Sequence, residues 1–151
     1  MTQSLTLDPG QASLTQWRSA LNASKVELTA NAWPAIDKSV AIVTDVVKSA
    51  KATYGVNTGF GKLASVSIAE KDLSALQRNL ILSHSAGAGP ALPDHVVRLM
   101  LAMKAASLAR GASGVQPTTV RALLDALAKN ALPVVPAKGS VGASGDLAPL
   151  A

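Results

Sequence analysis

Apolar side chains that recur every three or four residues are the feature that most restricts how this chain can fold. Ile36, Val40, Val43 and Val47 follow this spacing, which places all four on one face of an α-helix. Aromatic residues make up only 3% of the chain, against 48% hydrophobic residues, so the core must be built mainly from Ala, Leu and Val. Because Ala and Leu favour helices, we expect a mainly α fold.

Residues typical of helix ends predict where the helices begin and end. Ser13 and Gln16 form a capping-box pattern at the start of the first helix. The predicted helices run from Ser13 to about Leu21, from Asn31 to about Ser49, and over about 69–83, 93–109 and 118–129. Short strands are expected near the N-terminus, at 6–7 and 26–29, and the proline-containing remainder, 131–151, is predicted to be loop.

A glycine-rich stretch, Gly139–Asp146, carries residues suited to a peptide that reacts with itself. If the backbone nitrogen of Gly145 attacks the carbonyl carbon of Ala143, a five-membered ring closes. Loss of one water from the ring and of a second from the Ser144 side chain leaves an electrophilic exocyclic methylene. Glycine suits the attacking position because it has no Cβ and accepts tight backbone angles.

The neighbours of this triplet have roles too. Gly142 relaxes the backbone before it, and Asp146 can accept protons or hold the turn by hydrogen bonds. Such stretches are usually ordinary loops, and the chain contains a second copy, 112–114, after Gly111. We interpret that copy as the end of a helix, with a glycine in its C-cap region.

Three segments together resemble the histidine and aromatic amino acid ammonia-lyases. They are the string 139–151, the loop Tyr54–Gly61 and the segment Leu82–Gly87, in the order found in that family. The resemblance covers the whole chain and implies the N-terminal portion of an aspartase/fumarase-like helical fold, 1–151, without the central and C-terminal helical regions. It also implies a homotetramer whose active sites combine several subunits.

The resemblance implies that Ala143, Ser144 and Gly145 form a methylidene-imidazolone, with no external cofactor. Ser83-His84 is similar to the histidine ammonia-lyases, whereas the phenylalanine and tyrosine enzymes have Phe-Leu or His-Leu there. It therefore implies an imidazole-bearing substrate whose ring hydrogen-bonds to His84. From position alone, His84 is a partly buried histidine at the end of a helix.

The loop around Tyr54 lacks both the dinucleotide fingerprint and the Lys-Ser/Thr ending of a P-loop. A glycine-rich loop can instead open and close over a site. Tyr54 is either an ordinary loop residue or an acid or base in the reaction. The resemblance implies that Tyr54 faces the substrate and transfers protons, while Asn57, Thr58, Gly59 and Gly61 shape the loop.

The implied reaction is the non-oxidative deamination of L-histidine to trans-urocanate and ammonia, a step of histidine degradation. Either the amino nitrogen or the ring of the substrate attaches to the methylene. The alternatives are an inactive N-terminal fragment of such a lyase and a phenylalanine/tyrosine ammonia-lyase. A hydrolase is disfavoured because the G-x-S-x-G motif would need glycine at Asp146. We expect the 151-residue chain alone to carry an uncyclised triplet and no lyase activity.

Composition excludes several other functions. The chain has no cysteine and only two histidines, which argues against disulfides and against a metal site. The net charge of +5 comes from scattered basic residues with few aromatic partners, so we expect no nucleic-acid binding. We see neither a secretory signal nor a membrane span, and expect a cytoplasmic enzyme acting on a small amino acid.

Overall fold

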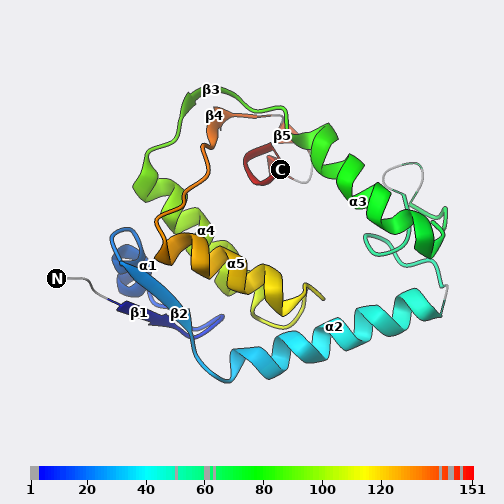
Figure 1. Cartoon of the computed structure of the whole chain (residues 1–151), viewed down its shortest axis with the longest axis horizontal. Coiled ribbons are helices and arrows are strands. Elements are labelled where there is room, and N and C mark those ends of the chain that lie inside the picture. The colour runs from blue at the N-terminus through cyan, green and yellow to red at the C-terminus, as the bar shows by residue number, and fades with distance from the viewer. Residues whose placement is uncertain are drawn as a thin grey trace. The chain divides into compact units, whose positions relative to one another are not determined.

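The structure, a computed structural model, confirms a mainly helical chain with short strands. It describes residues 4–49, 51–59, 62, 64–139, 141–142, 145–146 and 148–151. The long helices, drawn in Figure 1, are α1 (Leu14–Ala20), α2 (Ala32–Lys48), α3 (Glu70–His84), α4 (Asp94–Leu108) and α5 (Pro117–Ala128). Each lies within about a residue of its predicted bounds. Within the described part of the chain, none of the helices combines the length and apolar character needed to cross a membrane.

Six short strands pair two by two. β1 (Ser4–Leu7) and β2 (Lys25–Leu28) are parallel, close to where the two N-terminal strands were predicted. The other pairs are antiparallel: β3 (Ala88–Ala91) with β4 (Pro136–Lys138), and β5 (Val141–Gly142) with β6 (Gly145–Asp146).

The prediction of continuous loop over 131–151 was wrong. That segment contains β4, β5, β6 and a short 3₁₀ helix, η2 (Ala148–Leu150). These strands are only two or three residues long, and β4 begins with a proline. Strands of this length are too short to show an alternating pattern, and their pairing depends on residues distant in the sequence.

Both predicted helix-end features are present. The backbone N–H of Ser13 donates to Gln16 Oε1 (2.9 Å), and the backbone N–H of Gln16 donates to Ser13 Oγ (3.3 Å), which completes the capping box. After α4, whose C-cap is Ala109, Gly111 adopts a φ of +73°. A Cβ there would lie 2.6 Å from the carbonyl oxygen of Ala35, so a glycine is required where this helix ends.

The chain divides into two units, and α2 runs from one into the other. Unit 1 comprises the chain up to Ile42 together with Leu92–Val134, and unit 2 comprises Val43–Ala91 together with Val135–Ala151.

Unit 1 contains nearly all of the buried apolar side chains. Within it α4 packs on α5 and α1, and α5 also packs against β2. The buried apolar residues of unit 1 are Leu7, Ala20, Ala23, Val26, Leu28, Ala32, Ile36, Val97, Leu101, Ala102, Ala105, Ala106, Ala109, Val120 and Leu127.

Arg98 is a buried charged residue that ties this core together. Its Nη1 donates to the carbonyl oxygen of Leu127 (3.3 Å) and to Asn130 Oδ1 (2.9 Å), and its Nη2 donates to the carbonyl oxygen of Ala23. Leu127 lies in the last turn of α5, where the helix dipole presents partial negative charge. The guanidinium is therefore held by oxygen acceptors and by the C-terminal end of a helix.

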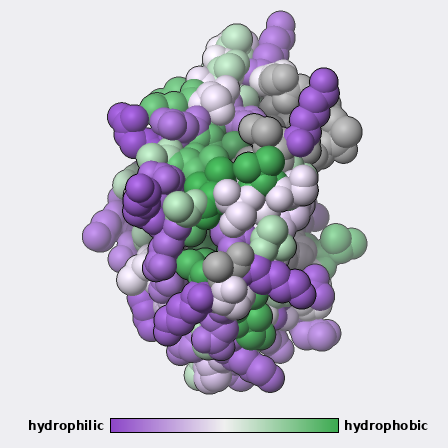
Figure 2. Space-filling view, turned by 90° about the vertical axis from the view of Figure 1, so that its right-hand side faces the viewer, coloured by the Kyte–Doolittle hydropathy of each residue, from purple (hydrophilic) through white to green (hydrophobic). Residues whose placement is uncertain are grey.

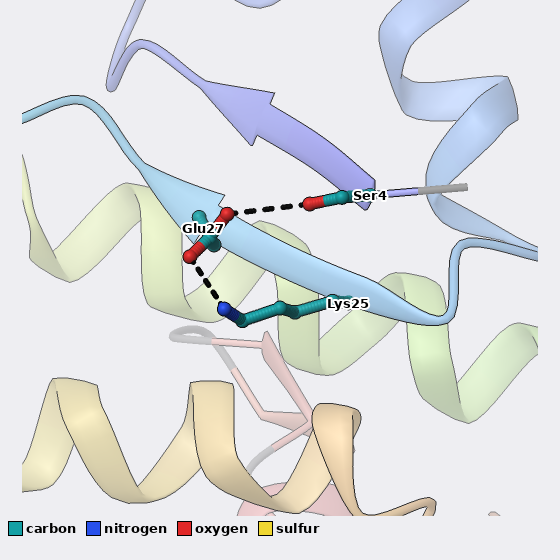
Figure 3. Close-up of polar contacts among 3 residues, drawn as sticks. All are labelled: Ser4, Lys25 and Glu27. Atoms are coloured by element: carbon teal, nitrogen blue, oxygen red, sulfur yellow. Dashed lines mark hydrogen bonds and ion pairs between the residues drawn. The ribbon is translucent and has the colours of Figure 1, made fainter. Parts of the chain in front are cut away.

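A small polar cluster lies on the strand pair of unit 1 (Figure 3). Glu27 contacts Lys25 Nζ at 2.7 Å and accepts a hydrogen bond from Ser4 Oγ at 3.2 Å. The hydrogen bond and positive charge of Lys25, helped by Ser4, lower the pKa of Glu27 below its ordinary 4.5. The cluster is exposed, so its contribution to stability is small.

Unit 2 has very little core of its own. No residue of α3, which the structure describes completely, is buried. Its most covered side chains are the half-buried Leu73, Leu76, Leu80 and His84, which follow the predicted stripe. On the same helix Leu82 is 57% exposed. Figure 2 shows such hydrophobic side chains at the surface among hydrophilic ones.

Candidate functional site

Tyr54 lies in a turn that the backbone closes on itself. The N–H groups of Val56 and Asn57 both donate to the carbonyl oxygen of Thr53, at 3.0 and 3.2 Å. Gly55 follows with a φ of +79°, a conformation that favours glycine. Tyr54 is 64% exposed, so much of the residue is accessible to a bound molecule.

The Asn57 side chain bridges both sides of Tyr54. Its Oδ1 accepts from the backbone N–H of Thr53 (2.8 Å), and its Nδ2 donates to the carbonyl oxygen of Lys51 (3.0 Å). Asn57 is only 3% exposed, and buried hydrogen bonds of this kind are costly to break. The amide therefore fixes the backbone that carries Tyr54.

The rest of this loop is held by a short antiparallel contact. Thr58 pairs with Ser67, and the N–H of Gly59 donates to the carbonyl oxygen of Val66 at 3.2 Å. Thr58 is buried, and its hydroxyl donates to the carbonyl oxygen of Gly59. Gly61, also predicted to shape the loop, lies outside the described residues.

His84 is the last residue of α3, one turn after Leu80. Its Nδ1 lies 2.7 Å from the carbonyl oxygen of Leu80 and 3.1 Å from Ser83 Oγ, and the Ser83 hydroxyl donates to the same carbonyl oxygen. Because a carbonyl oxygen can only accept, Nδ1 carries the proton. In the neutral ring, Nε2 then carries a lone pair and is a hydrogen-bond acceptor.

The strands β3 and β4 join the segment after His84 to the segment that leads to Gly139 (Figure 1). Ala88 lies opposite Lys138 and Ala91 opposite Pro136, so three steps along β3 match two along β4. This irregularity is a β-bulge, a feature often found beside active sites. The pairing was not predicted, although adjacent glycines and prolines in both segments are typical of bulged or edge strands.

The segment predicted to form the electrophile is flanked by an antiparallel strand pair. Gly142 lies opposite Gly145 in the β5–β6 pair, and Val141 lies opposite Asp146. The two residues between these strands, Ala143 and Ser144, lie outside the described residues, and no contact of the Asp146 side chain is described. The chain reverses direction across two residues, as in the shortest hairpins. A backbone nitrogen just after a reversal, a serine hydroxyl and a small residue before it fit the ring closure inferred from the sequence.

The described candidate residues of both loops, His84 and Ser83 all belong to unit 2. Two surface pockets in unit 1, of about 540 and 310 Å³, are lined by none of them. Among the described residues, no group of three or more His, Cys, Asp or Glu is placed to hold a metal ion. The described part of unit 2 therefore offers a phenol, an imidazole and the strand pair that flanks the predicted electrophile triplet.

Comparison with known proteins points to one family. The family described as aromatic amino acid lyase matches residues 12–151. Histidine ammonia-lyase of Paracidovorax citrulli (strain AAC00-1) is 54% identical over 148 residues, which are 97% of this chain and 29% of that protein.

Solved structures agree. Histidine ammonia-lyase from Trypanosoma cruzi matches with a TM-score of 0.82 and 32% identity, over 98% of this chain and 28% of that one. Tyrosine aminomutase from Streptomyces globisporus matches with a TM-score of 0.88 and 30% identity, over 98% of this chain and 28% of that one. The mainly helical fold with short strands thus matches the N-terminal part of these structures, and the chain spans less than a third of their length.

Proposed function

The chain belongs to the aromatic amino acid lyase family, and we propose that the protein containing it deaminates L-histidine non-oxidatively to trans-urocanate and ammonia. The observation that favours histidine over phenylalanine as the substrate is the hydrogen bonding of His84. With Nδ1 donating to the Leu80 carbonyl, Nε2 of the neutral ring accepts a hydrogen bond. An imidazole N–H of the substrate supplies the matching donor, which the ring of phenylalanine lacks.

The electrophile in this proposal comes from the chain itself. The Gly145 nitrogen bonds to the Ala143 carbonyl carbon, the former carbonyl oxygen leaves as water, and the Ser144 hydroxyl leaves as a second water with the Cα hydrogen. The resulting methylidene-imidazolone supplies an electrophilic carbon that, by covalent attachment, makes the substrate amino group a better leaving group. Gly142 and Asp146 flank the turn and hold its ends in register.

Proton transfer falls to Tyr54 in the proposal. The β-proton of the substrate passes to a base, its bonding electrons form the new carbon–carbon double bond, and the amino nitrogen leaves with its electron pair. A phenol whose backbone is fixed by the Asn57 amide can transfer these protons without first being positioned. Ser83 helps by accepting from, and so orienting, the His84 ring.

The relatives are much longer than this chain, so other elements of the proposal concern the whole protein. We propose a cytoplasmic homotetramer in which residues beyond this chain complete each site. A phenylalanine or tyrosine ammonia-lyase is the alternative substrate class. Comparing turnover of histidine, phenylalanine and tyrosine by a full-length protein that contains this chain separates the two.

Ser144→Ala tests the proposal most directly. Without the leaving hydroxyl no methylene forms, so we expect urocanate production, followed by its ultraviolet absorbance, to collapse in the full-length protein. The intact mass of the parent should be lower than that of its sequence by two waters, and this deficit should disappear in the variant.

Ser113→Ala is the matched control, because it alters the second Ala-Ser-Gly copy, which follows α4 in unit 1. It should keep both activity and mass deficit. Equal losses of activity in the two variants would contradict the assignment of residues 143–145.

A further inference from the structure

Gly87, just before β3, lies close to the ring of Pro136, the first residue of β4. A Cβ added to Gly87 would lie 2.7, 3.0 and 3.3 Å from Cγ, Cβ and Cδ of Pro136. Carbon atoms pack favourably at about 3.5–4.0 Å, so a methyl group does not fit. The proline ring is closed onto its own backbone and cannot rotate away, so the backbone itself would have to move.

This contact matters because the strand pair has few other constraints. Pro90 and Pro136 have no N–H to donate to the ladder. Gly89 has a φ of +85° within the irregular part of the pair, where the usual alternation of hydrogen bonds is interrupted. The spacing of the two segments therefore depends on packing, and the Pro136 ring leaves no room for a Cβ at Gly87.

The contact lies between two candidate site segments. His84 precedes Gly87 by three residues, and Ala143 follows Pro136 by seven. Chain segments of these lengths span at most about 10 and 25 Å even when fully extended. Gly87 and Pro136 therefore lie in the short segments that lead to the imidazole on one side and to the β5–β6 pair on the other.

We infer that Gly87 and Pro136 are positioning residues, whose contact sets the spacing between the segment after His84 and the segment that leads to the β5–β6 pair, which flanks the triplet. This inference rests on the proposed function, because the triplet matters only if it reacts. The φ of Gly87 is not in the left-handed region, so its backbone conformation does not by itself require glycine. Glycine is required at this position because the Pro136 ring is so close.

The test is Gly87→Ala in a full-length protein that contains this chain. The added methyl must displace the Pro136 ring by about 1 Å, and misplacement on that scale costs about 10²-fold in rate. We expect kcat for histidine to fall by about that factor, while the mass deficit of two waters persists. Pro136→Ala in the Gly87→Ala background removes the ring atoms Cγ and Cδ and should restore kcat at least tenfold.

Gly89→Ala is the matched control on the same strand. Its Cβ would meet the Lys138 side chain at an ordinary 3.4 Å, but its positive φ strains any side chain. We expect a lower melting temperature with kcat within about threefold of the parent. Equal kcat losses in Gly87→Ala and Gly89→Ala, or no recovery in the double variant, would overturn the inference.

Failure of the proposed function gives a different result. In that case the parent itself forms no urocanate and shows no mass deficit, and the positioning role falls with it. The contact is measured separately from activity in the full-length protein, by a double-mutant cycle on melting temperature with Gly87→Ala and Pro136→Ala. A non-additive pair confirms the contact, whereas strictly additive shifts contradict it.

Discussion

Unit 1 and unit 2 differ in what their residues do. Unit 1 buries a continuous set of apolar side chains from β1, β2 and all of its helices, and it contains none of the candidate site residues. Unit 2 contains Tyr54, Ser83, His84 and the triplet. Among its described residues only Asn57, Thr58, Gly59 and Val135 are buried.

The difference indicates that most of the buried core and the proposed site residues lie in separate parts of the chain. Burial of apolar surface is the main stabilising term in folding, so unit 1 supplies most of the stability of this chain. Side chains that act on a substrate must be reachable, and in unit 2 the proposed proton-transfer residue Tyr54 is exposed. The exposed hydrophobic residues of α3 in unit 2 leave apolar surface uncovered, as expected where a chain spans 29% of a relative.

The largest expected effect concerns ring formation in the 151-residue chain itself. Ring closure needs the Gly145 nitrogen pressed against the Ala143 carbonyl, a strained geometry that persists only when surrounding structure enforces it. Unit 2 has too few buried residues to do so. We expect the intact mass to equal that of the unmodified sequence and no urocanate to form. A deficit of two waters would mean that unit 2 enforces the geometry unaided.

Tyr54→Phe should have the next largest effect, and it should lower activity without lowering stability. In a full-length protein containing this chain, losing the hydroxyl should lower kcat by about 10²–10⁴-fold, the range for a general acid or base. The melting temperature should hardly change, because the ring is exposed and the Asn57 hydrogen bonds around it remain. Wild-type turnover in this variant would make Tyr54 a packing residue.

Two leucine-to-alanine variants, one in each unit, compare how well the two units are packed. Leu127→Ala in unit 1 removes a side chain with 0% exposure and should cost about 2–5 kcal/mol of unfolding free energy. Leu82→Ala in unit 2 removes one that is 57% exposed and should stay within about 0.5 kcal/mol. Urea unfolding of the 151-residue chain, followed by helical circular dichroism, measures both. Similar losses would show that α3 is packed as well as α5.

The features that could be predicted from the sequence are local ones. The helices and the Ser13–Gln16 capping box depend on residues within a few positions of one another, and their bounds were right to about a residue. The family was also readable, because the residues of each of its motifs stand together in the chain.

Long-range pairing could not be predicted in this way. The β3–β4 ribbon joins residues almost fifty positions apart through strands that are too short and too rich in glycine and proline to show a pattern. The tautomer of His84 depends on which carbonyl its ring meets, and the bridging role of Asn57 depends on the path of the turn around Tyr54. Each is a property of backbone geometry, which the residue types alone do not specify.

The smallest expected effect lies in the polar cluster of unit 1. The pKa of Glu27 is lowered in the folded chain by Lys25, so its carboxylate stabilises the fold above about pH 4.5, and this stabilisation is lost as pH falls through the lowered pKa. Glu27→Gln should therefore lower the melting temperature by only about a degree near neutral pH, because exposed ion pairs contribute little. The difference in melting temperature between parent and variant should disappear as the pH is lowered. Asp37→Asn, which also removes one exposed carboxylate, on α2, is the control for the change in net charge. A gap that widens toward acid pH would mean that the neutral form of Glu27 is the stabilising one, contrary to its contacts with Lys25 and Ser4.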